Sequence, residues 1–405
     1  MLIVKTPEEV FEIIERVFKA QAGTESSPLT EACGRILSAD IISAEDVPGF
    51  DRSTVDGYAV RAADTFGCSD SLPAVLKTKG EVQMGQSAGM CLQSGEAAAI
   101  PTGGQLPDGA DCVVMVEYTE DYGDGTVGIL RPAACGENVI FRGDDRKAGE
   151  VLLPAGTKLQ SAQIGALAAA GITEAMVCSR IRVGILSTGD ELVPAEETPA
   201  DGQVRDVNAP MLAAFVRAYG AEAVFYGILK DEENEIGRAL DRALCECDMV
   251  LISGGSSAGL KDKTARIIAD RGELLLHGIA MKPGKPTILG NAGGKPVVGL
   301  PGHPGAAYFV TELFVTALLD RLNGRRRQAF PLKAILTERV PANHGRAQYT
   351  GVSLREEKGV LMAEPVHSKS GLISSLAMAH GYIAVARDCE GLEKGEEVPV
   401  WRFSI

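Results

Sequence analysis

A regular alternation of strand-like and helix-like segments between residues 181 and 322 constrains the fold of this chain most strongly. Short apolar runs typical of buried strands cover residues 181–187, 223–227, 249–253 and 297–300. Segments with helical spacing run from Asn208 to about Tyr219, from Glu232 to Cys245, from about Asp262 onward and from Pro304 to about Leu322. Apolar strands that alternate with helices are typical of a parallel sheet covered on both faces. The middle of the chain is therefore predicted to be an α/β domain.

The segments on either side of this region have a different pattern. Thr6, Pro7 and Glu9 have the spacing of a helix start with a capping box. Short apolar runs separated by Gly and Pro then predict a small β-rich domain; they cover residues 74–76, 98–100, 112–116 and 127–130. Residues 163–171 are predicted to form a buried helix, and residues 330–405 a further all-β unit.

The charge and the cysteine pattern exclude several classes of protein. The 405 residues include 40 Lys and Arg against 54 Asp and Glu, a net charge of −14, which argues against a general binder of nucleic acid. No apolar run is long enough to span a bilayer, and acidic residues occupy the stretch where a signal peptide would be apolar, so a cytoplasmic location is expected. The nine Cys form no Cys-x-x-Cys pair and have no spacing to His that indicates zinc. The negative net charge does not exclude a small anionic ligand that binds in a local basic pocket.

Glycine-rich loops follow the predicted strands, where ligands bind in open parallel sheets. The loop Ser253-Gly254-Gly255-Ser256-Ser257-Ala258-Gly259 suits a phosphate, because free backbone N–H groups and a helix N-terminus can approach a ligand there. Asp262 follows within reach of Mg²⁺ or a nucleotide hydroxyl. The spacing matches neither the Walker A motif nor G-x-G-x-x-G. A plain turn is the alternative to an anion site.

Three further loops in this region carry charged side chains. Thr188-Gly189-Asp190-Glu191 places two adjacent carboxylates at a strand end, where they need a cation or hydrogen bonds, although a helix cap is the alternative. Lys282-Pro283-Gly284-Lys285-Pro286 holds two lysines on a stiff loop, which is either an oxyanion clamp or a rigid surface loop. Residues 299–303 end a strand and start a helix, and His303 alone is more often a hydrogen-bonded loop residue than a ligand.

Two acidic turns lie outside the α/β region. Residues 50–59 place Asp51 and Asp56 around one polar turn, and residues 141–145 place Asp145 in another. Each turn by itself is more often a cap than a site. Together with four Gly- or Pro-rich loops, however, they indicate a polyanionic ligand bound with a divalent cation.

In combination these motifs resemble one family, the molybdopterin molybdenumtransferases (MoeA), which are related to the E domain of gephyrin. The matching segments keep the family's order and spacing over nearly the whole chain; they are residues 50–59, 102–111, 142–145, 187–192, 253–255, 282–286 and 299–302. The resemblance implies that molybdate is inserted into adenylylated molybdopterin with release of AMP and that Mg²⁺ takes part. It also implies a homodimer whose two subunits both contribute to the site, with the molybdopterin adenylyltransferase as a candidate partner.

The resemblance further implies the fold class, a multidomain α/β plus β protein. A central three-layer α/β domain with a parallel-type sheet is expected beside a β-rich N-terminal domain, an elongated linking domain and a C-terminal β-barrel. The expected limits are 1–60 and 140–178 for the discontinuous elongated domain, 61–139 for the β-rich domain, 179–328 for the molybdopterin-binding domain and 329–405 for the barrel.

Site residues follow from the matching motifs. The carboxylates expected to take part in catalysis are Asp56, Asp145, Glu191, Asp231 and Asp262, of which Glu191 and Asp262 are the expected Mg²⁺ ligands. The residues expected to bind the pterin substrate are Thr102, Gly103, Ser253, Gly254, Gly255, Pro301 and Gly302. Carboxylates repel molybdate, so the residues expected to bind this anion are Lys282, Lys285, Arg346 and Ser370.

The chain departs from the family's pattern in three places. Ser256-Ser257-Ala258 stands where Val-Ser-Val is usual, His303 where Asn is usual, and Ser368-Lys369-Ser370 where Gln-Gly-Ser is usual. A tungstate-preferring paralogue is therefore one alternative to the molybdate enzyme. A non-catalytic scaffold is a second, although a scaffold would tolerate loss of the carboxylates. The related adenylyltransferase is a third, but it needs only the α/β unit.

Overall fold

The computed structural model describes residues 4–254, 258–325, 330–342, 344–367 and 371–404, and for residues 258–262 the backbone alone. The chain divides into two compact units. The first unit comprises Met1–Glu25, Gly34–Ile36 and Val177–Ile405, and the second comprises Ser26–Cys33 and Leu37–Met176. β1 (Thr24–Pro28) and β12 (Glu174–Cys178) lie where the chain passes from one unit to the other. The finer division into four domains stays a prediction.

A six-stranded sheet in the order β16-β13-β17-β21-β20-β18 forms the centre of the first unit. Its strands are β13 (Arg182–Thr188), β16 (Glu222–Leu229), β17 (Met249–Gly254), β18 (Glu273–His277), β20 (Ile288–Ala292) and β21 (Lys295–Leu300). The first four strands in this order run parallel, as the sequence predicts, whereas β20 and β18 are antiparallel to their neighbours. The antiparallel edge arises because Gly293 and Gly294, both with positive φ, close a tight hairpin between β20 and β21.

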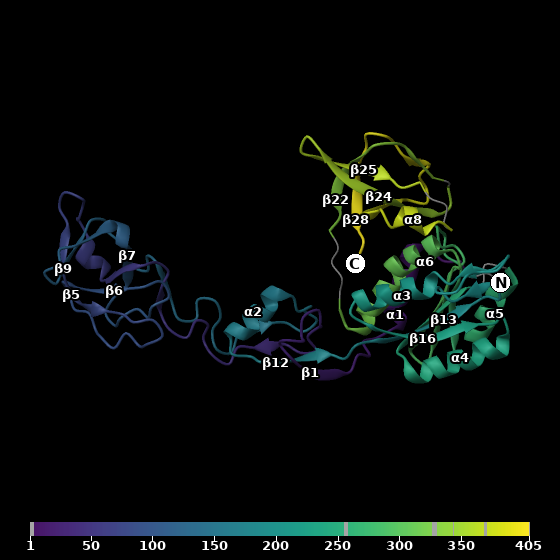
Figure 1. Ribbon diagram of the computed structural model, residues 1–405, viewed down its shortest axis with the longest axis horizontal. Helices are drawn as coiled ribbons and strands as arrows, with labels where there is room; N and C mark the ends of the chain where they lie inside the picture. Colours follow the sequence, from purple (N-terminus) through teal and green to yellow (C-terminus); the bar gives the residue numbers. More distant parts are fainter. Residues whose placement is uncertain (1–3, 255–257, 326–329, 343, 368–370, 405) are drawn as a thin grey trace. The chain divides into compact units, whose positions relative to one another are not determined.

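Helices cover both faces of this sheet, with α1, α3 and α6 on one side and α4 and α5 on the other (Figure 1). Their bounds are α1 (Pro7–Val17), α3 (Asn208–Ala218), α4 (Glu233–Glu246), α5 (Ala258–Ala269) and α6 (Pro304–Val310), which continues through the π-helical turn η3 (Thr311–Val315) into α7 (Thr316–Leu322). On β13, Ile185 belongs to the core under α1 and α3, and its neighbour Leu186 to the core under α4 and α5. This alternation confirms the prediction of a covered sheet.

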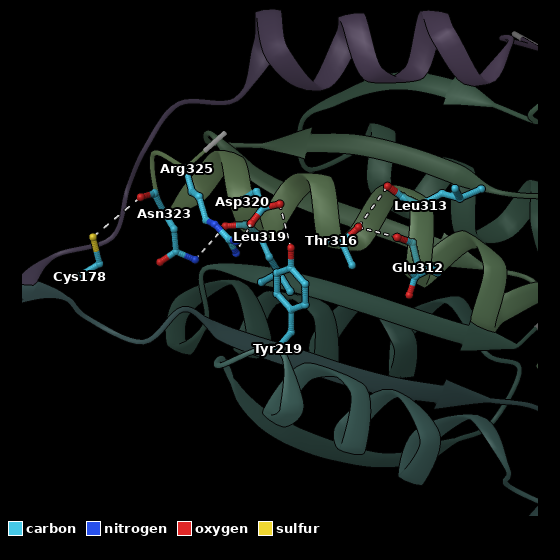
Figure 2. Close-up of polar contacts among 9 residues, drawn as sticks. All are labelled: Cys178, Tyr219, Glu312, Leu313, Thr316, Leu319, Asp320, Asn323 and Arg325. Carbon is cyan, nitrogen blue, oxygen red and sulfur yellow. Dashed lines mark hydrogen bonds and ion pairs between the residues drawn. The ribbon is translucent and has the colours of Figure 1, made fainter. Parts of the chain in front are cut away.

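The N-terminal helix begins at the predicted capping box. Thr6 Oγ1 accepts a hydrogen bond from Glu9 N at 3.3 Å, and a Glu9 carboxylate oxygen accepts one from Thr6 N at 2.8 Å. At its other end α1 packs along α7, where Arg321 Nε donates to the carbonyl of Phe18 at 2.7 Å. Figure 2 shows a second set of contacts on α7, in which the Tyr219 hydroxyl donates to Asp320 at 2.8 Å. These bonds join α1, α3 and α7 into one layer.

The C-terminal part of the first unit closes into the predicted β-barrel. Its strands follow the order β24-β25-β22-β28-β26, and β26 pairs back onto β24. The bounds are β22 (Leu332–Leu336), β24 (Ala347–Glu357), β25 (Val360–Pro365), β26 (Gly381–Val385) and β28 (Glu397–Arg402), beside the pair β23 (Val340–Pro341) and β27 (Gly391–Leu392). A short helix, α8 (Ile373–Leu376), interrupts the all-β pattern predicted for residues 330–405.

One strand of the α/β region joins the barrel. β19 (Met281–Lys282) runs parallel to β24, with Lys282 opposite Gln348. The sequence suggested that the loop from Lys282 to Pro286 belongs with the loops after the parallel sheet. The loop instead leaves a strand that pairs with the barrel, because Met281 is buried in the core shared by the two parts.

The short strands β14 (Leu192–Val193) and β15 (Val204–Arg205) pair with each other.

The second unit is built on an open six-stranded sheet, in the order β7-β4-β6-β5-β9-β8. Its strands and two 3-10 turns are β4 (Gly57–Val60), η1 (Ala62–Thr65), β5 (Ala74–Glu81), β6 (Glu96–Ile100), β7 (Cys112–Met115), η2 (Val116–Tyr118), β8 (Thr119–Asp121) and β9 (Thr126–Ile129). The four strands predicted from apolar runs are all present. The pairs β2 (Ile41–Ile42) with β11 (Val151–Leu153), and β3 (Arg52–Ser53) with β10 (Val139–Ile140), complete its strands.

The helix predicted at residues 163–171 forms as α2 (Ser161–Ala169), but it is not buried. Leu167 alone is buried along it. Its apolar character comes from Ala and Gly, whose small side chains do not require burial. Among the described residues, no helix is long and apolar enough to cross a membrane. All nine Cys are free thiols.

Candidate ligand site at the sheet edge and the barrel

The parallel strands bring their carboxyl ends to one edge of the central sheet. In the pairing register, Thr188 lies opposite Leu229 on one side and Gly254 on the other, and Ser253 lies opposite Leu300. The loops that follow Thr188, Leu229, Gly254 and Leu300 therefore converge, as expected for the ligand edge of an open sheet.

The Gly254 backbone makes the closest approach at this edge. Its φ is +141°, and a Cβ at this position would lie 2.0 Å from the carbonyl oxygen of Thr188. Glycine is thus required where β17 ends. Gly255 and Ser256 lie outside the described residues. The helix after this loop begins at Ala258, earlier than predicted, so Asp262 lies inside α5 and its side chain is outside the description.

A cavity of about 300 Å³ lies at the start of α3 and unites several predicted residues. Residues from the converging loops that line it are Glu191, Asn208, Ser253, Gly254, Gly302 and His303. The buried side chain of Asn208 holds two of these loops, because its Nδ2 donates to Ser253 Oγ at 2.8 Å and to the carbonyl of Gly302 at 3.0 Å. The prediction that residues 253–254 and 302 lie together is therefore consistent with the geometry.

Carboxylates gather beside this cavity at the end of β16. Burial raises the pKa of Asp231 above its ordinary value, the charges of Asp190 and Glu191 raise it further, and Lys263 opposes the shift. The backbone N–H of Asp231 donates to Asp190 Oδ1 at 3.3 Å, and Lys263 Nζ donates to the Asp231 carbonyl at 3.2 Å. The Asp231 side chain keeps one buried oxygen, Oδ1, without a hydrogen-bond partner. Such a group of carboxylates, with one oxygen unpartnered, suits a divalent cation.

The described residues include no cluster of three His, Cys, Asp or Glu side chains already arranged to hold a metal. The predicted pair of Glu191 and Asp262 stays untested, since the Asp262 side chain is not described. A larger cavity of about 1,120 Å³ opens beside these acidic groups, with Asp190, Asp206 and Asp231 in its wall.

A basic cavity of about 620 Å³ lies between the α/β part and the barrel. Lys282, Lys285, Pro301 and Arg346, predicted from three separate places in the chain, all line it. The two histidines in its wall are His303 and His367, and His367 Nε2 lies 2.6 Å from a Glu338 carboxylate oxygen. Ser370 falls outside the described residues. Because the two lysines and the arginine face one space, the cavity can receive an oxyanion.

The second unit holds the other predicted residues. Asp56 accepts hydrogen bonds from Thr102 N at 2.7 Å and Thr102 Oγ1 at 3.0 Å, and these bonds lower the pKa of its carboxyl group. Gly103 follows with φ +82°, and its N–H donates to the Ser53 carbonyl at 2.8 Å. Asp56 and Thr102, which the sequence analysis assigned to separate roles, are thus in direct contact.

The turn at residues 141–145 combines capping with an exposed carboxylate. Asp144 accepts from Phe141 N at 2.7 Å, and Asp51 accepts from Arg142 N at 2.7 Å. These two acids therefore cap the backbone of the turn, as the sequence analysis expects for each acidic turn taken by itself. Asp145 is held by its backbone N–H, which donates to the Val47 carbonyl at 3.0 Å, and its side chain is exposed.

Sequence reasoning missed three residues at this edge. Asp206 was not recognised, Asn208 was interpreted only as the start of a helix, and Lys263 was not considered. The signal for the first two was their place at the N-terminus of α3, because a helix that starts at the carboxyl edge of a sheet begins beside the ligand. Lys263 had no comparable signal.

The fold and these cavities define a class: a multidomain protein with an open α/β sheet that carries a cavity at its carboxyl edge, beside a basic cavity against a barrel. Three family models match nearly the whole chain. They are the MoeA N-terminal region (domain I and II) at residues 5–171, the probable molybdopterin-binding domain at residues 184–321 and the MoeA C-terminal region (domain IV) at residues 333–403. The chain belongs to the MoeA family.

Relatives of known name agree with this assignment. The molybdopterin molybdenumtransferase of Bacillus subtilis is 33% identical over 408 residues, which cover 99% of this chain and 95% of that protein. The protein of the same name from Nostoc is 33% identical, over 99% of this chain and 93% of that protein. The crystal structure of the molybdopterin biosynthesis MoeA protein of Pyrococcus horikoshii is 34% identical, with a TM-score of 0.87 over 99% of this chain and 100% of that one. The predicted family and fold class are confirmed.

Proposed function

We propose that this protein is a molybdopterin molybdenumtransferase, which inserts molybdate into adenylylated molybdopterin and releases AMP during molybdenum cofactor biosynthesis. One observation carries the proposal. His303 lines both the cavity that contains Ser253, Gly254 and Gly302 and the basic cavity that contains Lys282. A site for a substrate phosphate therefore adjoins a site for an oxyanion, which is what the transfer of molybdate to a phosphorylated pterin requires.

The carboxylates at the sheet edge have a defined part in this proposal. Asp231 and Glu191 would hold Mg²⁺ together with Asp262, and the buried, unpartnered Oδ1 of Asp231 fits a cation. When bound, Mg²⁺ neutralises the substrate pyrophosphate and polarises the bond that releases AMP. The backbone amides near Ser253, Gly254 and Gly302 would orient the terminal phosphate of the pterin.

The basic cavity is proposed to hold molybdate. Lys282, Lys285 and Arg346 supply the positive charge, with Ser370 as a further donor on the barrel side. Phe309 and Tyr349 also line this cavity and give it part of its apolar wall. A desolvated anion interacts more strongly with these cations than it would in bulk water.

The proposal also includes a homodimer, in which both subunits contribute residues. Asp56, Thr102, Gly103 and Asp145 take part in the reaction in this proposal. The two hydrogen bonds that Asp56 accepts from Thr102 support this part, since they hold two of these residues together. The adenylyltransferase that makes the adenylylated substrate is proposed to deliver it directly.

Release of AMP tests this function. Purified protein is incubated with adenylylated molybdopterin and Mg²⁺, and with molybdate, with tungstate or with neither. The proposal predicts release that depends on molybdate and falls at least about 100-fold in Glu191→Gln, as when a group that stabilises the transition state is lost. Glu197→Gln, at an exposed residue between β14 and β15, serves as the control and is expected to match the wild type.

Each other result would count against part of the proposal. Release with tungstate alone would indicate the paralogue with an altered oxyanion preference. If the protein binds the substrate but releases no AMP with either oxyanion, the enzyme assignment is wrong and a scaffold is favoured.

A further inference from the structure

Two buried acceptor oxygens at the start of α3 have no partner in the described part of the chain. They are Asp206 Oδ2 and Asn208 Oδ1. Asp206 is 4% exposed and Asn208 is 6% exposed, and both line the 300 Å³ cavity that also contains Ser253 and Gly254. Leaving a buried oxygen without a hydrogen bond costs stability, so such a group in a native structure needs an explanation.

The orientation of the Asn208 amide is fixed by its neighbours. Its Nδ2 lies 3.0 Å from the carbonyl oxygen of Gly302, which can only accept a hydrogen bond. The amide nitrogen must therefore face Gly302, and the second contact, to Ser253 Oγ at 2.8 Å, agrees with this. Consequently Oδ1 is held on the other side of the amide group, as an acceptor.

The second oxygen of Asp206 is not needed for the local fold. Asp206 Oδ1 caps α3 by accepting from Ala209 N at 3.1 Å, and the Asp206 backbone N–H donates to the Val193 carbonyl at 2.8 Å. Capping uses one oxygen only, and Ser or Asn would supply it equally well. A carboxylate at this buried position therefore adds a second acceptor to the residue that Asp206 contributes to the cavity wall.

From these observations we infer that Asp206 and Asn208 determine specificity by accepting hydrogen bonds from the aminopyrimidinone edge of the pterin ring. This edge carries an amino group and an adjacent ring N–H, so it offers donors side by side. Two acceptors that belong to residues 206 and 208 complement it, whereas the phosphate groups of the substrate carry no such donors. The inference rests on the proposed function, because it assigns the pterin to the cavity that the substrate phosphate also approaches.

Binding of molybdopterin and of AMP, measured separately by calorimetry, tests this inference. In Asp206→Asn the oxygen that caps α3 is kept, and a donor replaces the second acceptor. We expect molybdopterin to bind roughly 10- to 100-fold more weakly, the loss typical of a hydrogen bond to a charged group, and AMP to bind as it does to the wild type. Asp206→Ser also keeps a cap and is expected to show the same selective loss, while the exposed Asp201→Asn is expected to change neither affinity.

The remaining outcomes overturn the inference. Unchanged molybdopterin affinity in both Asp206 variants would show that its second oxygen recognises nothing. An equal loss for both ligands would indicate a general disturbance of the site, and a loss for AMP alone would place the adenine in the cavity. If the wild-type protein binds no molybdopterin, the proposed function fails together with the inference, whereas the preceding outcomes remove the inference alone.

Discussion

The carboxylate of Glu312, in the π-helical turn of the α/β part, accepts hydrogen bonds from the backbone N–H and the hydroxyl of Ser404 near the end of the barrel. The N–H contacts to the two oxygens are both 3.1 Å, and Glu312 is 1% exposed. Beside this pair, the ring of Phe403 packs edge-on against Tyr308, with 5.1 Å between the ring centroids. These contacts hold the last residues of the barrel against the α/β part, next to the basic cavity.

Removing the hydrogen bonds between Glu312 and Ser404 should destabilise the first unit. Glu312→Ala leaves the donors of Ser404 without an acceptor, and we expect the free energy of unfolding to fall by about 2–3 kcal/mol. Denaturation in urea measures the change. Glu15→Ala is the control, because Glu15 forms an exposed ion pair with Arg321 at 3.3 Å and should cost less than about 1 kcal/mol. An equal loss of unfolding free energy in the two variants would contradict the claim that the Glu312–Ser404 hydrogen bonds stabilise this unit.

The close approach of Gly254 to Thr188 predicts a strict requirement for glycine. Gly254→Ala would force the carbonyl of Thr188 to move, and we expect a loss of at least about 2 kcal/mol in stability together with loss of substrate binding. Gly202→Ala is the matched control, since Gly202 also has a positive φ (+86°) but nothing within 4 Å of an added Cβ. It should cost about 1 kcal/mol and leave binding unchanged. Retention of wild-type affinity in Gly254→Ala would show that this edge does not bind the substrate.

The raised pKa of Asp231 predicts how stability changes with pH. The native protein keeps the Asp231 proton to a higher pH than the unfolded chain, because burial, Asp190 and Glu191 disfavour its charge. The charged form of Asp231 therefore lowers the stability of the folded protein. This loss is absent below the unfolded pKa of about 3.9, grows as the pH rises through the raised native pKa and is complete at neutral pH. Asp231→Asn should therefore stabilise the protein at pH 7 by up to about 1 kcal/mol, since water screens this partly exposed group, and change little at about pH 3.

Mg²⁺ provides the second arm of this test. A cation at the acidic group would compensate the Asp231 charge, so Mg²⁺ should raise the melting temperature of the wild type more than that of Asp231→Asn. A variant that is less stable than the wild type at pH 7 without Mg²⁺ would refute the electrostatic account.

The basic cavity predicts a defect that is specific for the oxyanion. Lys282→Ala and Lys285→Ala should each raise the molybdate concentration needed for half-maximal AMP release by roughly 10-fold or more, as for a lost charge-assisted hydrogen bond. Binding of the adenylylated substrate should change little. Lys394→Ala, an exposed lysine in a barrel turn, controls for the loss of one positive charge. An unchanged molybdate dependence in both variants would remove molybdate from this cavity.

Local signals in the sequence were enough for much of the fold. The capping box of Thr6 and Glu9 and the apolar runs of the sheet are each determined by short-range geometry, and each is present. The motifs at residues 253–254 and 301–302 also converge, because the carboxyl ends of parallel strands meet at one edge.

What the sequence did not reveal depends on contacts between distant segments. Lys282 pairs with Gln348 through β19 and β24, and nothing near Lys282 indicates that partner. The role of Asp206 was hidden for a similar reason, since the cavity that it lines forms only when the loops carrying Ser253 and Gly302 are in place. The Ala-rich helix α2 looked buried because composition alone does not distinguish small apolar side chains on a surface from those in a core.

The most direct test of the central claim compares AMP release with molybdenum transfer in the same reaction. Wild-type protein, adenylylated molybdopterin, Mg²⁺ and molybdate are mixed, and AMP and dithiolene-bound molybdenum are measured over time. The account predicts that both appear together, one molybdenum for each AMP, and that AMP release stops when molybdate is left out. Release of AMP at the same rate without molybdate, or without molybdenum in the pterin, would contradict it.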